Sequence, residues 1–240
     1  MQHELEVSAD AGAVAAKAAA YVAGLARAAV AARGRFTFAV SGGHTPWAMF
    51  AELAHEEVPW AQVELFQVDE RVAPDGDPDR NLTHLRASLG DAPARVHPMP
   101  VTGGTGGTGG TGGTGGPGGT GGGNGTDLDA AAAAYGTMLP QRFDLVHLGL
   151  GPDGHTASLV PGDPVLGVTD ALVAVTEPYQ GHQRMTLTYP ALARADQLLW
   201  LVTGADKHEA LARLLAGDES IPAGRVTAAR SLVMADAPAA

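Results

Sequence analysis

Short apolar segments alternate with helix-forming segments along most of this chain, and this alternation constrains the fold more than any other feature. The apolar segments lack the polar alternation of half-exposed strands. We therefore expect strands buried on both faces, in a mostly parallel sheet covered by helices on both sides. The expected strands are 35–40, 63–68, 144–150, 171–175, 197–203 and 231–235. The expected helices run over 11–32, from an N-cap at Thr45 with Pro46 to about Glu57, from Asp127 to about Leu139, and from Asp206 to about Ala216.

A glycine-rich tract interrupts this pattern at 103–125, where Gly occupies two of every three positions. Only one proline falls within it, so the tract is typical of a flexible linker and not of collagen. The alternation of strands and helices continues on both sides of it. We therefore expect one domain over 1–240, with 102–126 as a flexible Gly/Thr-rich insertion that is dispensable for catalysis; a boundary between two domains is the alternative.

Composition and charge exclude several classes of protein. The net charge of −11 repels nucleic acid and anionic membranes, so an anionic ligand needs a local cluster of positive groups. The absence of cysteine excludes disulfides and thiolate metal sites. No apolar run approaches the roughly 20 residues of a membrane span, and the N-terminus lacks the pattern of a secretory signal. We expect a cytoplasmic protein that binds neither nucleic acid nor membranes.

In open α/β sheets ligands bind beyond the carboxyl ends of the strands, and two junctions in the first half of the chain are unusual there. At VSGGHTP (40–46) small residues permit a close backbone approach, and the free amides of a helix start attract an anion such as phosphate. An ordinary strand-to-helix turn is the alternative. At QVDER (67–71) the charges of Asp69, Glu70 and Arg71 predict either a solvated loop or part of a site, and Asn81 is suited to cap a helix or to line a pocket.

A third junction, TGADKHEA (203–210), places Lys207 in the first turn of a helix. A cation at this end opposes the helix dipole at a cost of about 0.3 to 1 kcal/mol, which a bound anion would reverse. A plain surface lysine is the alternative interpretation.

The fourth junction, LGLGPDGHTASLVPG (148–162), contains the letters G-x-G-x-x-G of a dinucleotide site. Pro152 removes an amide that a phosphate would need, and Pro161 and Pro164 curtail any following helix. A sharp turn that presents Asp153 and His155 fits better. Histidine suits proton transfer near neutral pH, and a neighbouring carboxylate is able to orient it. The alternative is a histidine that only caps the loop or completes its hydrogen bonds.

The sequence holds no HExxH motif and no G-x-S-x-G elbow. His44, His55, His147 and His155 do not have the spacing of metal ligands. We therefore expect neither a catalytic metal nor a covalent serine intermediate.

Together, VSGGHTP, QVDER with Asn81, LGLGPDGHTASLVPG, QRMTLTYPAL and TGADKHEAL resemble the 6-phosphogluconolactonases, hydrolases of the oxidative pentose phosphate pathway within the glucosamine/galactosamine-6-phosphate isomerase superfamily. The resemblance spans nearly the whole chain except the glycine tract. It implies a modified Rossmann-like, three-layer α/β/α domain that binds no nucleotide or other cofactor. The implied partner is a small sugar phosphate lactone, with no obligate protein partner.

The resemblance also implies roles for individual residues. His155 would be the general base that activates water to open 6-phospho-D-glucono-1,5-lactone, with no covalent intermediate, and Asp153 would orient it. Asp69 or Asn81 would contact sugar hydroxyls, with Arg71 beside the lactone or the phosphate. The phosphate would be held by Ser41, Gly42, Gly43 and Thr45, with positive charge from Arg184 and Lys207.

The chain departs from the family pattern at two informative positions. Arg80 stands where a serine is common, and we expect it either to contact phosphate or to face solvent. Val160 replaces a phenylalanine and is expected to change packing only. A glucosamine-6-phosphate deaminase-like enzyme is the closest rival, but the carboxylate that follows its D-G-H is missing here. A non-catalytic sugar-phosphate sensor is the rival from another class.

Overall fold

The computed structural model describes residues 2–101 and 127–240. Seven strands form one sheet in the order β1-β10-β9-β6-β2-β3-β5, with every neighbouring pair parallel. The prediction of a mostly parallel sheet is confirmed. The strands are β1 (Glu4–Ser8), β2 (Phe36–Val40), β3 (Val63–Gln67), β5 (Arg95–His97), β6 (Leu145–Gly149), β9 (Gln197–Val202) and β10 (Arg230–Asp236). The insertion expected at 102–126 lies outside the described residues, and strands from both sides of it join this sheet.

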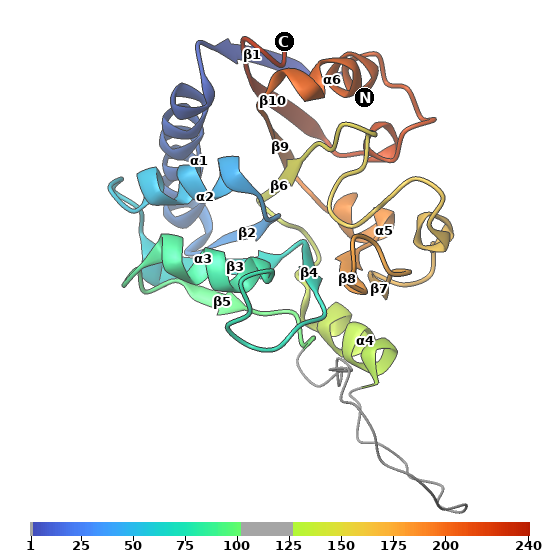
Figure 1. The fold of residues 1–240 in the computed structure, drawn as a ribbon. Coiled ribbons are helices and arrows are strands. Elements are labelled where there is room, and N and C mark those ends of the chain that lie inside the picture. Colours follow the sequence, from blue (N-terminus) through green and yellow to red (C-terminus); the bar gives the residue numbers. More distant parts are fainter. Residues whose placement is uncertain (1, 102–126) are drawn as a thin grey trace, which may run out of the picture.

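Helices cover both faces of the sheet, which confirms the three-layer α/β/α arrangement (Figure 1). They are α1 (Ala11–Arg33), α2 (His44–Leu53), α3 (Asn81–Leu89), α4 (Leu128–Met138), α5 (Tyr189–Leu192) and α6 (His208–Leu215). Leu145 of β6 packs in the cluster that contains α1, α2 and α3. The next residue, Val146, packs in the opposite cluster with α4 and α6. Because both faces are buried, the strand sequences have no polar alternation.

Helix α1 spans 23 residues and is long and apolar enough to cross a membrane by length and composition. The expectation that no apolar segment approaches this length was wrong, because Lys17 and Arg27 interrupt the run without making the helix polar. In this fold Val14, Ala18 and Val22 are buried in the core cluster beside the sheet, as in a core helix. The cytoplasmic location stays a prediction.

A second sheet of three strands was not expected from the sequence. It has the order β4-β8-β7 and consists of β4 (Asp69–Arg71), β7 (Val173–Val175) and β8 (Arg184–Leu187), all antiparallel. The expectation that 171–175 joins the parallel sheet was therefore wrong. Strand β4 follows β3 after the single residue Val68, so the small sheet extends directly from the carboxyl edge of the large one.

The start of α2 also differs from the prediction. Gly43 is the N-cap, at a φ of 133° that favours glycine, and the helix ends at Leu53 instead of near Glu57. Thr45 is therefore inside the helix. Its Oγ1 lies 2.7 Å from Oγ1 of Thr203, which follows β9, so its hydroxyl joins two strand ends instead of capping the helix.

Candidate active site

A cavity of about 420 Å³ lies at the carboxyl edge of the central strands, within the volume range of small-molecule sites. The four junctions singled out in the sequence meet there, because β9, β6, β2 and β3 are neighbours in the sheet. Every predicted site residue except Asp153 lines the cavity. These residues are Ser41, Gly42, Gly43, Thr45, Asp69, Arg71, Asn81, His155 and Lys207 from the junctions, and Arg184 from β8.

The loop after β2 is pressed against Asn81. A Cβ atom at Gly42 would lie 2.0 Å from Oδ1 of Asn81, so only glycine fits this position without a shift of the amide. Asn81 lines the cavity, as one of its two expected roles required, but it does not cap the helix: it is the first residue of α3, the N-cap position belongs to Arg80, and the Asn81 side chain is bonded to Asp69 and Arg71.

A buried histidine on β6 accepts a hydrogen bond from the backbone of the same loop. The backbone N–H of Ser41 donates to Nδ1 of His147 on β6, at 3.4 Å. Burial lowers the pKa of His147 to about 3, so the ring is neutral and its Nδ1 is free to accept. From the sequence, His147 was considered only as a metal ligand and rejected for its spacing, so its structural role was not predicted. Across residues 2–101 and 127–240 no cluster of three metal-ligating side chains occurs.

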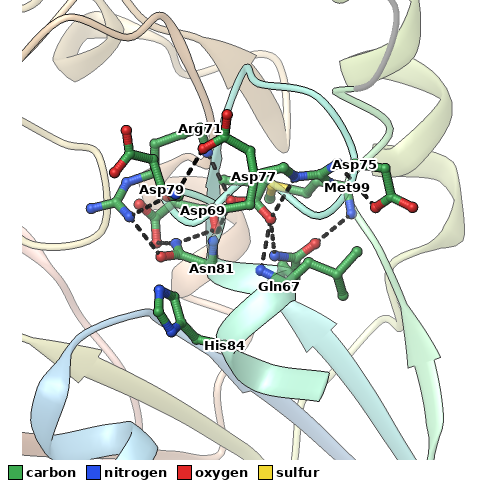
Figure 2. Close-up of polar contacts among 12 residues, drawn as sticks. Gln67, Asp69, Arg71, Asp75, Asp77, Asp79, Asn81, His84 and Met99 are labelled. Carbon is green, nitrogen blue, oxygen red and sulfur yellow. Dashed lines mark hydrogen bonds and ion pairs between the residues drawn. The ribbon is translucent and has the colours of Figure 1, made fainter. Parts of the chain in front are cut away.

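Strand β4 supplies a carboxylate and a guanidinium to the cavity (Figure 2). Oδ2 of Asp69 accepts from Oγ of the buried Ser158 at 2.7 Å, and burial raises the pKa of Asp69. The Asn81 side-chain amide donates to the backbone oxygen of Asp69 at 2.9 Å. Nη1 of Arg71 donates to Oδ1 of Asn81 at 3.1 Å and to the backbone oxygen of Asp79 at 2.7 Å. The orientation of Arg71 is therefore fixed by the loop that precedes α3.

Glu70 and Arg80 lie beneath that loop, and neither faces solvent or the cavity. The Glu70 carboxylate accepts from the backbone N–H groups of Asn81 and Leu82, at 2.7 and 2.9 Å, and so caps α3. Nε of Arg80 lies 3.4 Å from Oε2 of Glu70. Both roles expected for Arg80 were wrong: the arginine is buried because a buried carboxylate offers it a partner.

Arg71 and Arg184 occupy directly opposite positions on the antiparallel pair β4 and β8. Like charges at such positions repel, so the pair is costly without a compensating anion. Burial and the neighbouring Arg71 lower the pKa of Arg184, while Asp69 partly offsets the repulsion. The arrangement favours an anion or a developing negative charge in the cavity.

The loop after β6 presents His155 to the cavity and keeps Asp153 behind it. Nδ1 of His155 lies 2.6 Å from Oδ1 of Asp153, which also accepts from the His155 backbone N–H at 3.1 Å. Burial alone raises the pKa of Asp153, but the hydrogen bonds from His155 outweigh it and the net pKa is lowered. An ionised carboxylate only accepts, so in the neutral ring Nδ1 carries the proton and Nε2 has the lone pair.

Lys207 enters the cavity from the turn after β9. The lysine lies in a 3₁₀ turn, Ala205–Lys207, directly before α6, and its Nζ is 2.8 Å from Oδ2 of the exposed Asp206. The positive charge therefore stands at the start of a helix, as the sequence indicated.

The residues at the site that were not predicted from the sequence include Ser158, Thr203 and Gln180. The Ser158 hydroxyl donates to the Asp69 carboxylate, and the Thr203 hydroxyl is hydrogen-bonded to that of Thr45. Gln180 lines the cavity from the turn between β7 and β8. Ser158 and Thr203 lie within the quoted junction motifs, so their small hydroxyl side chains were a usable signal. Nothing local marked Gln180, because its strand partners were not predicted.

Comparison with known proteins agrees with this geometry. The model of the glucosamine-6-phosphate isomerase and 6-phosphogluconolactonase family matches residues 9–234. The 6-phosphogluconolactonase of Mycobacterium tuberculosis is 35% identical over 260 aligned residues, which cover 100% of this chain and 98% of that protein. The 6-phosphogluconolactonase of Synechocystis sp. is 34% identical over 192 residues, covering 78% of this chain and 75% of that one.

Solved structures agree on the fold. The 6-phosphogluconolactonase of Trypanosoma brucei superposes with a TM-score of 0.82 at 23% identity, covering 99% of this chain and 97% of that chain. At this identity the likeness shows the fold alone. Because the family model matches nearly the whole length and relatives exceed 30% identity, this chain belongs to the family of glucosamine-6-phosphate isomerases and 6-phosphogluconolactonases.

Proposed function

We propose that this chain is a 6-phosphogluconolactonase, which hydrolyses 6-phospho-D-glucono-1,5-lactone to 6-phospho-D-gluconate in the cytoplasm. The observation that carries the proposal is the Asp153–His155 pair, which leaves Nε2 of His155 as an acceptor in a cavity with two opposed arginines. The relatives named as 6-phosphogluconolactonases support it. Water is the second reactant, so the reaction needs no cofactor.

In the proposed mechanism, Nε2 of His155 takes a proton from water while the water oxygen bonds to the lactone carbonyl carbon. The carbonyl oxygen gains negative charge, which the guanidinium groups of Arg71 and Arg184 stabilise. The tetrahedral intermediate then breaks the bond between the carbonyl carbon and the ring oxygen. The imidazolium returns its proton to that oxygen, so no bond to the protein forms. The ionised Asp153 stabilises the transient positive charge on His155.

The phosphate is proposed to bind at the loop Ser41–Thr45, near Lys207. Gly42 lies in close contact with Asn81, which accepts a hydrogen bond from Arg71, so this loop and Arg71 are connected through Asn81. Phosphate binding thereby fixes where the lactone lies relative to His155, which is its main contribution to the rate.

The two rivals require features that this site does not offer. A deaminase of this family is expected to place a carboxylate where this chain has Val160, a buried side chain that does not line the cavity. A sensor would bind the sugar phosphate without turnover. It would not need a histidine whose tautomer is set by a carboxylate.

The test is the rate of hydrolysis of freshly generated 6-phosphogluconolactone above its spontaneous background. We expect His155→Ala to lose at least about 10²-fold in kcat, as for removal of a general base. His55→Ala is the matched control, because His55 is exposed and does not line the cavity. Equal rates for wild type and His155→Ala would overturn the mechanism, and release of ammonia from glucosamine 6-phosphate would favour the deaminase.

A further inference from the structure

The turn that joins β7 to β8 reaches the cavity with a side chain that has no assigned role. The backbone N–H of Tyr179 donates to the oxygen of His182 at 2.9 Å, and the N–H of His182 donates back to Tyr179 at 3.2 Å. Only Gln180 and Gly181 stand between them, with φ values of 50° and 85°. This is the geometry of a two-residue hairpin turn whose first position normally holds Asn, Asp or Gly.

Gln180 is therefore an unfavourable residue for its own backbone conformation. Among the described residues, Ala157 and Gln180 are the non-glycine residues with positive φ, and both line the same cavity. Such conformations concentrate at functional sites, where the surrounding structure maintains them. A glycine would relieve the strain at position 180, so the glutamine side chain is retained at a cost to stability.

The contacts of the Gln180 amide are long and connect it to the predicted reaction centre. Its Oε1 accepts from Nη2 of Arg184 and its Nε2 donates to Oη of Tyr179, each at 3.4 Å. The Tyr179 ring lies edge-on to His155, with centroids 5.9 Å apart, and 5.0 Å from the Arg184 guanidinium carbon. Bonds of this length leave the amide free to exchange them for a ligand.

A contact outside the cavity, between His182 and Asp79, also holds this turn in place. Nε2 of His182 lies 3.0 Å from Oδ2 of Asp79, whose backbone oxygen accepts from Arg71. The loop before α3 and the turn between β7 and β8 therefore share one anchor at Asp79. The position of Gln180 is set by this contact as well as by the strands.

We propose that Gln180 is a substrate-binding residue that recognises hydroxyl groups of the lactone ring; this inference rests on the proposed lactonase function. An amide both donates and accepts, which matches hydroxyl groups and suits a phosphate less well. Gln180 lies beside Arg184 and next to the residue that contacts His155, so it faces the reacting end of the sugar. The phosphate is proposed to bind elsewhere, at Ser41–Thr45.

The decisive variant is Gln180→Gly, which removes the amide and fits the positive φ. We expect an unchanged or higher melting temperature, kcat within about threefold of wild type, and KM raised by up to about tenfold, the effect of one lost hydrogen bond. A merely structural glutamine would not raise KM in a protein that became more stable. Gln180→Asn tolerates the same φ and keeps a shorter amide, so its KM is expected to fall between the other two. Gln183→Ala, in an exposed neighbour outside the cavity, is the control.

Deoxy lactones that lack one ring hydroxyl sharpen the test. Wild type is expected to discriminate against the analogue that lacks the contacted hydroxyl, and Gln180→Gly is expected to lose that discrimination. If Gln180→Gly keeps the wild-type KM and discriminates against every deoxy lactone as wild type does, the inference is wrong. Failure of the proposed function is seen separately, as wild type without turnover. In that case the affinity of each protein for 6-phosphogluconate, measured by calorimetry, decides whether Gln180 binds the sugar.

Discussion

The imidazole of His155 lies against the α-carbon of Gly151. A Cβ atom at Gly151 would lie 2.1 Å from Nδ1 and 2.2 Å from Cε1 of the ring. The backbone closes the same turn, with the Gly151 N–H donating to the His155 oxygen at 2.8 Å. The second glycine of the G-x-G-x-x-G letters is therefore required by the histidine beside it and not by a nucleotide, and the third, Gly154, is required by its φ of 82° and by the close approach of Ile221.

The contact between Gly151 and His155 makes Gly151→Ala a test of how strictly the histidine must be placed. The added methyl group must displace the ring from Asp153, and a misplacement of about 1 Å costs on the order of 10²-fold in rate. We expect a fall in kcat of that size, measured by steady-state lactone hydrolysis. Gly167→Ala is the control, because a Cβ atom there would have nothing within 4 Å and the residue does not line the cavity. Equal kcat values for both variants would contradict this account of the loop.

Replacing Asp153 by Asn tests the tautomer. The carboxylate holds the proton on Nδ1 of His155, whereas an amide is able to donate to Nδ1 and turn the N–H toward the substrate. We expect kcat to fall by about 10² to 10⁴-fold, the range for loss of general-base catalysis, with KM changed little. A large rise in KM at unchanged kcat would instead assign Asp153 to substrate binding.

The Glu70–Arg80 pair is predicted to matter for stability. Glu70→Gln leaves the buried Arg80 charge with only the exposed Asp75 carboxylate, 3.5 Å from Nη1. We expect a loss of about 3 kcal/mol in the free energy of unfolding, the lower end of the range for a broken buried pair. Replacing both, as Glu70→Gln with Arg80→Met, is expected to recover part of that loss. Urea denaturation of the single and double variants measures the coupling. If the two single losses simply add, the residues do not interact as described.

His147 predicts a loss of stability in acid. Burial lowers its pKa from 6.5 to about 3 in the folded protein, so below pH 6.5 the unfolded chain binds the proton more readily. The stabilisation that comes from the neutral His147 is complete above pH 6.5 and is lost as the pH falls toward 3. Over this interval the free energy of unfolding falls by up to about 1.4 kcal/mol per pH unit. We expect His147→Leu to flatten the profile of unfolding free energy against pH in this interval. A profile parallel to that of wild type would show that another group controls acid unfolding.

Five strands of the large sheet, β2, β3, β6, β9 and β10, were predictable from the sequence because they are local apolar segments between helices. The two edge strands β1 and β5 were not predicted, because ELEVS and RVH are short and partly polar. The small sheet was not predicted either, because β4 consists of the charged residues Asp69, Glu70 and Arg71, and its partner β8 lies more than a hundred positions further along the chain. The four junctions were predictable because each is local and follows a strand. The burial of Arg80 and the contribution of Gln180 depend on long-range pairing that no local pattern shows.

The strand order also has a consequence for synthesis of the protein. Strand β6 is inserted between β2 and β9, although it follows β2, β3 and β5 in the chain. While the chain emerges from the ribosome, the edge of β2 stays unpaired until residues 145–149 have been made. An apolar edge of this kind is open to mispairing with other nascent chains, and early binding by a chaperone would protect it.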